Sequence, residues 1–286
     1  MNSAESRSIT VKAYAKLNLW LDITGRRADA YHLLNTVMTA VDLADEVTVA
    51  LNGSGGIAVS CDEPAVPADE RNIAYRAAKL FAGLHDPALG ADIVIKKHIP
   101  TEAGLGGSST DGAAVLLAMN ELCGKPFSAD TLAAAGVRLG ADVPFCVYGG
   151  TAVCRGIGEQ IKPVSCPDFA ALIVKPDFSC STAAAYRAYD EAPRPEKPGF
   201  AEFCGALISG NFPADSLYNV FEELYADPRI ADIRRSLLDA GALGACLTGS
   251  GSAVFGVFGT LSEARKAAEK LGISSEFAVK NISADR

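Results

Sequence analysis

A segment rich in glycine and hydroxyl residues constrains the fold of this chain more than any other feature. It spans residues 100–111, reads P-T-E-A-G-L-G-G-S-S-T-D, and follows a short apolar run at 93–95. The pattern predicts a strand, a tight loop and a helix with one buried face. The residues expected on that face are Ala113, Leu116, Leu117 and Met119. Backbone N–H groups without helical partners would converge where the helix dipole is positive, so we expect the loop to bind a polyphosphate.

Two well-known phosphate loops do not match this segment. A Walker A loop ends in Gly-Lys-Ser or Gly-Lys-Thr, whereas no lysine follows these glycines. A dinucleotide-binding loop carries G-x-G-x-x-G in the first βαβ unit, whereas Ser109 stands at the third glycine position here. A glycine–serine connector that binds no ligand stays open as an alternative.

Composition limits the class of protein. The chain has 286 residues, 49% of them hydrophobic, and a formal net charge of −8. This length supports one large domain or two modest ones, and the acidic balance argues against a general binder of nucleic acid or of membrane surfaces. No run of residues has the length and hydropathy of a membrane span or a signal peptide. We therefore expect a soluble cytoplasmic protein without nucleic-acid or membrane partners, in which local positive charge meets any anionic substrate.

Cysteine and histidine usage points away from a resident metal. The eight cysteines form no C-x-x-C pair, and the chain has only three histidines. Such spacing is not that of a zinc site, and widely separated cysteines are typical of reduced thiols in a core. The sequence therefore predicts no metal site of its own.

Alternating strand and helix patterns predict an α+β chain in two lobes. Expected strands lie at 9–14, 17–23, 47–51, 57–59, 93–95, 151–154, 170–174, 245–248, 253–258 and 277–282. Expected helices lie at 72–81, after the glycine loop, at 128–139 with Ser128 as N-cap, at 182–189, at 215–240 broken near Pro228, and at 262–271. A composition shift at 156–168 suggests domains 1–160 and 161–286, and 192–198 is expected as an exposed proline-rich connector.

Two further segments carry residues suited to chemistry. In A-K-L-N-L at 15–19, Lys16 and Asn18 would lie on one face of a strand, because side chains two positions apart point the same way. A solvated strand face is the alternative for this pair. In L-G-A-D-V-P at 139–144, Asp142 is either a helix cap or a functional carboxylate.

Taken together and in order, these segments resemble the GHMP small-molecule kinases. The matching pieces are A-K-L-N-L, Tyr31-His32, the loop 100–111, L-G-A-D-V-P, and L-T-G-S-G-S-A-V-F at 247–255. The loop and the late glycine turn are shared by the superfamily. The other three pieces are typical of members whose substrate is a polyol linked to cytidine diphosphate.

The resemblance implies a fold and a reaction. The N-terminal lobe would be like ribosomal protein S5, the C-terminal lobe would be ferredoxin-like, and a cleft between them would hold ATP with its Mg²⁺ and the small-molecule substrate. The γ-phosphoryl group of ATP would pass to an alcohol, with Asp142 as the base and Lys16 stabilising charge on the reacting oxygens. The protein would be a monomer or a weak homodimer.

The resemblance also assigns binding residues. Those around the ATP phosphates are Pro100, Thr101, Glu102, Ala103, Gly104, Leu105, Gly106, Gly107, Ser108, Ser109 and Thr110, with Asn72 and Lys97 beside the adenosine. Those around the other substrate are Tyr31 and His32 at the cytosine, Tyr186 as a second aromatic wall, Asn18 at the diphosphate or polyol, and Thr182 in the same pocket. Ordinary packing is the alternative for Tyr31.

Three departures stand out from the family pattern. The family usually has glycine where this chain has Ala30, Glu102 and Ser108. A carboxylate beside a polyphosphate would repel it, so we expect Glu102 to point to solvent. A hydroxyl at Ser108 can donate to phosphate if its φ is negative.

Three other classes of function stay open at this stage. A different GHMP kinase, acting on homoserine, mevalonate or a sugar, would keep the phosphate loop without a cytidine pocket. A non-catalytic nucleotide binder would need neither Lys16 nor Asp142. A dinucleotide-dependent oxidoreductase would need an early βαβ fingerprint that the chain lacks.

Overall fold

The computed structural model describes residues 7–224 and 227–283. The chain forms two compact units made of interleaved segments. Unit 1 comprises 1–15, 44–99 and 107–148, and unit 2 comprises 16–43, 100–106 and 149–286. Strands β1 (Ser8–Arg26) and β2 (His32–Asn52) contribute residues to both. Each unit is therefore made of separate segments, whereas the expected domains, 1–160 and 161–286, are each one continuous segment. Those domain boundaries stay a prediction.

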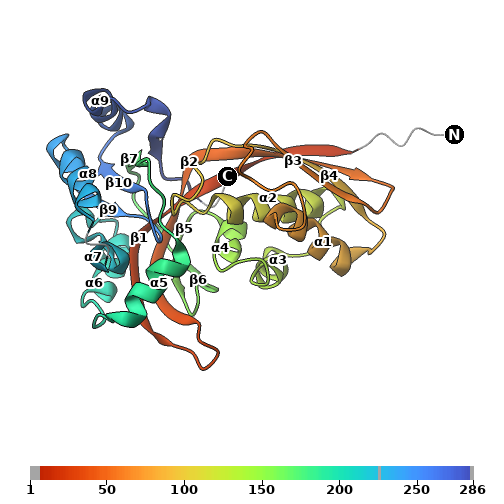
Figure 1. The fold of residues 1–286 in the computed structure, drawn as a ribbon, viewed down its shortest axis with the longest axis horizontal. Coiled ribbons are helices and arrows are strands. Elements are labelled where there is room, and N and C mark those ends of the chain that lie inside the picture. Colours follow the sequence, from red (N-terminus) through yellow and green to blue (C-terminus); the bar gives the residue numbers. More distant parts are fainter. Residues whose placement is uncertain (1–6, 225–226, 284–286) are drawn as a thin grey trace. The chain divides into compact units, whose positions relative to one another are not determined.

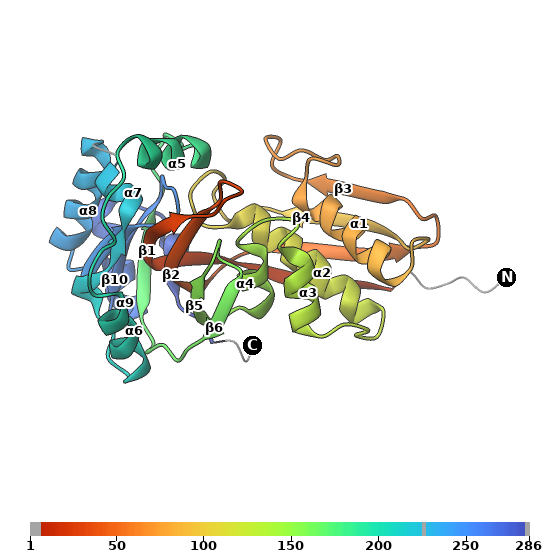
Figure 2. The same cartoon turned by 90° about the horizontal axis from the view of Figure 1, so that it is seen from below.

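Unit 1 is a sheet covered by helices. The strand order is β3 (Ile57–Cys61), β4 (Gly90–Lys96), β2 and β1, with β3 parallel and β2 antiparallel to β4. The helices are α1 (Ile73–His85), α2 (Gly107–Leu122), α3 (Ala129–Gly136) and α4 (Val143–Tyr148). In both views α1, α2 and α3 lie on the same side of β3 and β4 (Figure 1, Figure 2). The core between the layers is built from apolar side chains of both.

The predicted order of strand, loop and helix is confirmed, because β4 is followed by the glycine segment and then by α2. One detail of the helix is wrong. Leu117 is 37% exposed, whereas most of the helix from Thr110 to Asn120 is buried. Helix α2 is packed on more than one side, so a single apolar stripe does not describe it.

Unit 2 contains a four-stranded antiparallel sheet. Its order is β11 (Ala278–Lys280), β7 (Ala170–Val174), β10 (Val254–Phe258) and β9 (Gly244–Leu247). Helix α8 (Pro228–Asp239) packs against β9 and β10, and α9 (Leu261–Leu271) against β7, β10 and β11 (Figure 1). A capping box at Thr260 and Glu263 starts α9, and Gly272 ends it. This layer of helices on an antiparallel sheet matches the expected α+β class.

The remaining elements of unit 2 include several that the sequence patterns did not predict. The strand predicted at 151–154 is confirmed as β5 (Thr151–Arg155), and the helix predicted at 182–189 as α5 (Thr182–Glu191). The elements that were not predicted are β6 (Gln160–Pro163), α6 (Phe200–Ile208), a 3-10 turn (Ala214–Ser216), β8 (Tyr218–Asn219) and a second 3-10 turn (Ser275–Phe277). The two helices expected at 215–240 with a break near Pro228 correspond to α7 (Val220–Leu224) and to α8, which begins at Pro228. The first is shorter than expected at its start, because Tyr218 and Asn219 form β8, which pairs with β1. The connector at 192–198 is exposed, as expected.

Two further boundaries were wrong in extent. Helix α3 begins after its predicted N-cap Ser128, whose side chain accepts from Thr131 N–H, but it ends at Gly136 rather than 139. Strand β2 runs for 21 residues, although only its last part alternates visibly. Residues 36–41 are buried without interruption, and such a stretch shows no period of two.

Candidate functional site

Lys16 and Asn18 lie together in unit 2, on one face of β1 as predicted. The Lys16 Nζ donates to Asn18 Oδ1 at 2.6 Å. The same oxygen accepts the Gly249 N–H at 2.9 Å, and the Asn18 amide donates to the Thr36 hydroxyl at 2.9 Å. Both side chains are buried, at 4% and 3% exposure. A solvated strand face is therefore excluded for this pair.

The first part of the phosphate loop packs on the late glycine turn of the same unit. Gly104 has φ +75°, and a Cβ there would collide with the Thr248 carbonyl oxygen. Gly106 has φ +76°, and a Cβ there would lie 3.0 Å from the Lys16 Cγ. The Ala253 N–H also donates to the Ala103 oxygen at 3.1 Å. Gly104 is thus required by close backbone approach and by its positive φ, and Gly106 by its positive φ beside the Lys16 side chain. The two turns enclose the lysine.

The second part of the loop starts α2 in unit 1. Ser108 is exposed, and Ser109 lies beside the segment that carries Asp142, because a Cβ on Gly140 would be 3.6 Å from the Ser109 Oγ. Thr110 differs, since its buried hydroxyl donates to the Tyr14 oxygen at 2.8 Å. Ser108, Ser109 and Thr110 are all expected around the ATP phosphates, but the hydroxyl proton of Thr110 is already engaged in a hydrogen bond inside the fold.

Asp142 immediately precedes α4. Its carbonyl oxygen accepts the Cys146 N–H at 3.0 Å, and its side chain is half-buried. Helix α4 has six residues, of which the second is Pro144, a residue tolerated in a first helical turn. The backbone thus places Asp142 at a helix start, and the second part of the loop, from Gly107 on, lies with Asp142 in unit 1.

Lys97 is not exposed beside a ligand pocket but lies in a buried charge cluster of unit 1. Its Nζ bonds to the carboxylates of Asp45 and Asp111, and the latter contact is 2.8 Å. Asp45 also accepts the backbone N–H groups of His98 and Ile99 at 2.6 and 2.8 Å. The cluster therefore ties the segment before the phosphate loop to β2 and to the first turn of α2. The expected place of Lys97 beside adenosine stays a prediction.

Burial and charge within the cluster shift the pKa values of Asp111 and Lys97. Burial raises the pKa of the Asp111 carboxyl to about 7, with the ammonium of Lys97 opposing and Asp45 adding to the rise. Burial alone would lower the pKa of Lys97, but the two carboxylates outweigh it and raise that pKa. The Asp111 Oδ1 is buried and has no hydrogen-bond partner in the described part of the chain. Two carboxylates thus face one lysine in this interior, and the raised pKa of Asp111 lets it keep a proton in place of a second negative charge.

Asp111→Asn is expected to flatten the pH dependence of stability. A folded-state pKa raised from 3.8 to about 7 means that the native state keeps a proton that the unfolded chain has released. Unfolding free energy of the wild type therefore falls as pH rises through this window. The fall between about pH 5 and about pH 8 should shrink by about 1 kcal/mol or more in the variant. Urea unfolding at both pH values measures this fall in unfolding free energy. An equal fall in the wild type and the variant would contradict the raised pKa of Asp111.

Asn72 caps α1 rather than presenting a free amide. Its oxygen accepts the Ala74 N–H at 2.8 Å, and its nitrogen donates to the Pro67 oxygen at 2.7 Å. The side chain is 6% exposed. These bonds are those of an N-cap, and the expected place of Asn72 beside adenosine stays a prediction.

Two of the residues expected around a cytosine, His32 and Tyr186, meet in unit 2. The rings of His32 and Tyr186 stack with centroids 4.7 Å apart, and His32 Nε2 lies 2.7 Å from Asp190 Oδ1. That hydrogen bond lowers the pKa of the Asp190 carboxyl. Thr182, at the start of α5, bonds to the Ser250 hydroxyl of the late glycine turn at 2.8 Å. Tyr31 is 59% exposed, which excludes ordinary core packing for its ring.

Two of the three departures from the family pattern fall at left-handed backbone positions. Ala30 has φ 71° and Glu102 has φ 53°, where glycine costs least. Glu102 is exposed, in agreement with the expectation for its carboxylate. Ser108 lies in α2 and is absent from the residues with positive φ, so its hydroxyl meets the stated condition.

Glu102→Gly is expected to stabilise the fold. The exchange removes a left-handed side-chain penalty and raises the unfolding free energy by up to about 1 kcal/mol, while ATP affinity changes less than about threefold. Thr101→Gly is the matched control, because glycine at a position without positive φ lowers stability. Thermal unfolding and ATP titration measure both effects. A strongly raised ATP affinity in Glu102→Gly would contradict an outward-pointing carboxylate.

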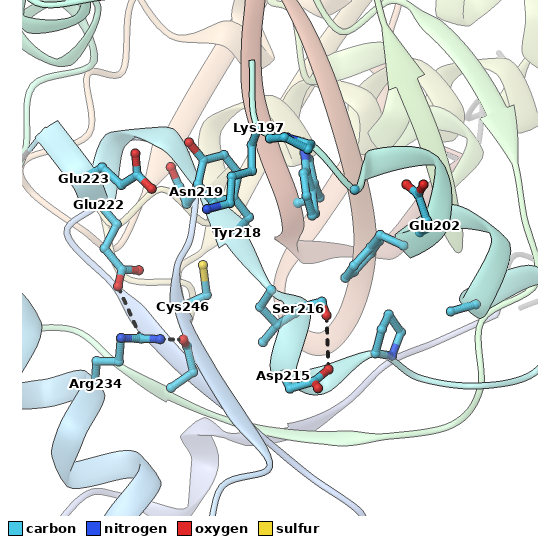
Figure 3. A pocket seen from close by; sticks show the side chains of 18 residues that line it. Lys197, Glu202, Asp215, Ser216, Tyr218, Asn219, Glu222, Glu223, Arg234 and Cys246 are labelled. Atoms are coloured by element: carbon cyan, nitrogen blue, oxygen red, sulfur yellow. Dashed lines mark hydrogen bonds and ion pairs between the residues drawn. The ribbon is translucent and has the colours of Figure 1, made fainter. Parts of the chain in front are cut away.

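A pocket of about 750 Å³ lies in unit 2 but contains none of the predicted residues. Figure 3 shows Lys197, Tyr218 and Asn219 on its wall, with the Glu222–Arg234 ion pair of 3.4 Å beside them. Trp20, the single tryptophan, also lines it, and its buried Nε1 has no hydrogen-bond partner in the described residues. This pocket is therefore distinct from the lysine between the glycine turns.

Two other kinds of site are absent from residues 7–224 and 227–283. No cluster of three or more histidine, cysteine or acidic side chains could hold a metal ion there. No helix in the same residues combines the length and hydropathy needed to cross a membrane.

Several residues of these clusters were missed from the sequence. Thr248 bonds to the Asn18 N–H at 3.1 Å, Asp45 and Asp111 hold Lys97, and Asp190 holds His32. The only available signal was spacing in Y-x-x-Y-D at 186–190, which puts Tyr186, Tyr189 and Asp190 on one helical face.

Known proteins match this chain over most of its length. The family model "GHMP kinases N terminal domain" matches residues 72–150, and "GHMP kinases C terminal" matches 218–275. Relatives called 4-diphosphocytidyl-2-C-methyl-D-erythritol kinase are 42% identical, one from Clostridium botulinum (strain Eklund 17B / Type B) and one from Geobacter metallireducens. The alignments cover 92% of this chain and 95% of the first relative, and 96% and 97% for the second. A crystal structure of 4-(cytidine 5'-diphospho)-2C-methyl-D-erythritol kinase is 34% identical, with a TM-score of 0.79 over 96% of this chain and all of that chain.

Identity of this size over almost the full length exceeds what a shared fold alone requires. It also removes the dinucleotide-dependent oxidoreductase as an alternative, because the matched models and relatives are kinases. The chain belongs to the GHMP kinase family, among the members called 4-diphosphocytidyl-2-C-methyl-D-erythritol kinase.

Proposed function

We propose that this chain transfers the γ-phosphoryl group of ATP to the 2-hydroxyl of 4-diphosphocytidyl-2-C-methyl-D-erythritol, in the non-mevalonate route to isoprenoid precursors. The observation that carries the proposal is the buried Lys16, held by Asn18 between two glycine turns. It occurs in a chain whose relatives, over more than nine tenths of its length, bear the name of that kinase.

In this proposal Asp142 takes the proton of the attacking hydroxyl. That hydroxyl is tertiary and weakly acidic, so a positioned carboxylate lowers the barrier. Lys16 stabilises charge that develops on the transferred group and on the reacting oxygen. Asn18 acts first as a positioning residue, because its oxygen already accepts from Lys16 and Gly249, while its second amide hydrogen serves the substrate.

The phosphates are held by residues 100–110. Backbone N–H groups of the loop and of the start of α2 donate to the phosphate oxygens, and the helix dipole adds to the attraction. Because phosphoryl transfer asks for alignment and charge neutralisation more than for covalent chemistry, this cradle and Lys16 supply most of what is needed. Asn72 and Lys97 serve the adenosine side by fixing α1 and the segment before the loop.

The hydroxyl oxygens at the start of α2 are suitable ligands for a Mg²⁺ ion that arrives with ATP. Mg²⁺ prefers hard oxygen ligands, and this turn offers the hydroxyls of Ser108 and Ser109. When bound, the ion neutralises charge on the β- and γ-phosphates.

The cytidine end is assigned to Tyr31, His32 and Tyr186. An exposed tyrosine ring can cover one face of a pyrimidine, and the histidine can bond to its polar edge. Thr182 lies beside them on α5 and links this region to the late glycine turn. We further propose a cytoplasmic location, and a monomer or weak homodimer as the working state.

A coupled ATP-consumption assay tests the proposal. The cytidyl substrate should support turnover, whereas homoserine, mevalonate and galactose should not, and CMP should inhibit. Turnover with another alcohol alone would favour a different GHMP kinase. An absence of turnover with every compound, together with ATP binding, would favour a non-catalytic nucleotide binder.

A further inference from the structure

The ring of His32 is held on three sides by helix α5. Tyr186 stacks on one face at 4.7 Å, the edge of Tyr189 meets it at 6.0 Å, and Asp190 bonds to Nε2 at 2.7 Å. These three residues lie on one face of α5, at positions i, i+3 and i+4. The His32 side chain is only 11% exposed. Its orientation is therefore determined by one helix.

The supports of His32 are themselves fixed. The Tyr189 hydroxyl donates to the Ile23 oxygen at 3.2 Å, and the Tyr186 ring meets the edge of Phe221 at 5.0 Å. The guanidinium of Arg26 lies 3.5 Å from the other oxygen of Asp190. Arg26 thus keeps the carboxylate charged and turned toward the imidazole.

The contact with Asp190 decides which ring nitrogen carries the proton. A carboxylate only accepts, so Nε2 must donate to it. In a neutral imidazole the other nitrogen, Nδ1, is then an acceptor. No hydrogen bond to this nitrogen is formed by the residues at 7–224 and 227–283. The ring therefore presents one acceptor to a ligand.

We infer that Asp190 is a specificity-determining positioning residue, which fixes His32 so that Nδ1 accepts the exocyclic amino group of a cytosine base. The inference rests on the proposed function, since it concerns the same cytidine end. At the 4-position cytosine carries an amino donor, whereas uracil carries a carbonyl acceptor. An acceptor at Nδ1 bonds to the first and repels the second, so the carboxylate on α5 sets the choice between two pyrimidines of the same shape.

The test compares wild type with Asp190→Asn. An asparagine can donate as well as accept, so it no longer dictates the tautomer. The preference for CMP over UMP as inhibitors of turnover should fall by roughly tenfold, the size expected for one net hydrogen bond, while kcat at saturating substrate changes less than about twofold. Glu191 is the next residue on α5 and is also exposed, so Glu191→Gln is a control that removes the same charge. It should change neither the preference for CMP over UMP nor kcat.

Nitrogen NMR provides a readout that a merely structural role would not move. With only three histidines in the chain, long-range proton–nitrogen correlations at about pH 8, where histidines are ordinarily neutral, can be assigned by His32→Gln. Wild type should show His32 protonated at Nε2, and Asp190→Asn a mixture of tautomers.

Each outcome decides a separate point. An Nδ1-protonated ring in wild type, or an unchanged CMP-to-UMP ratio in Asp190→Asn, overturns the inference even if the cytidyl substrate is turned over. If neither nucleotide inhibits wild type, the proposed function fails, and the spectrum still shows whether Asp190 fixes the ring.

Discussion

Asp142→Asn is expected to lower kcat by about 10²- to 10⁴-fold, the range of a general base. The amide keeps the size of the side chain but cannot take a proton from the hydroxyl. The backbone role of Asp142 at the start of α4 does not depend on the carboxylate, because it is the main-chain oxygen that accepts from Cys146. ATP affinity should therefore stay within about threefold, so the loss appears in kcat.

Asp130→Asn is the matched control for this variant. Asp130 also lies in unit 1 at the start of a helix, and its carboxylate accepts from the Tyr148 hydroxyl at 2.6 Å. The amide oxygen can still accept from that hydroxyl, but without the negative charge the contact is weaker, so the variant should lose some stability without any effect on the chemical step. Steady-state kinetics and ATP titration on both proteins separate the effects. Near-normal turnover by Asp142→Asn would show that the base is another group.

Lys97→Met is expected to destabilise the fold by about 3–5 kcal/mol, the cost of removing one partner from a buried ion pair. The variant leaves Asp45 and Asp111 in the interior with no cation between them, and their side chains are 0% and 4% exposed. Asp45 keeps its two backbone donors, so the cost falls mainly on Asp111. Urea unfolding followed by circular dichroism measures the difference.

The neighbouring pair provides an internal control. Lys96 and Glu46, each one position along the chain from Lys97 and Asp45, lie 3.6 Å apart, but their side chains are 63% and 42% exposed. Lys96→Met should therefore cost no more than about 1 kcal/mol. Asp111→Asn should also cost little, because it leaves one lysine with one aspartate. If Lys96→Met and Lys97→Met lowered the unfolding free energy equally, the buried charge cluster of Lys97 at the start of α2 would be contradicted.

Part of this site could be predicted from local rules. The loop 100–111 combines glycine freedom with a helix start, and both properties act within a few residues. The side chains of Lys16 and Asn18 had to share a strand face, because the period of a strand is two. Ser128 was recognisable as an N-cap by the same kind of short-range argument.

What could not be predicted depends on contacts distant in sequence. Lys96 and Lys97 are adjacent and chemically identical, but Lys96 at the end of β4 is exposed, whereas Lys97, which directly follows the strand, is buried against Asp45 of β2 and Asp111 of α2. Asp190 reaches His32 across 158 positions. Helix α4 has too few residues to show a period, so Asp142 could not be placed relative to a helix.

Product analysis by NMR tests the central claim most directly. After reaction of the wild-type protein with ATP and 4-diphosphocytidyl-2-C-methyl-D-erythritol, the phosphorus spectrum should gain one phosphomonoester resonance, and carbon 2 of the erythritol unit should couple to that phosphorus. The diphosphate resonances of the substrate should persist. A spectrum with ADP but no such ester, or with the new phosphate on a different oxygen, would contradict phosphorylation of the 2-hydroxyl by this chain.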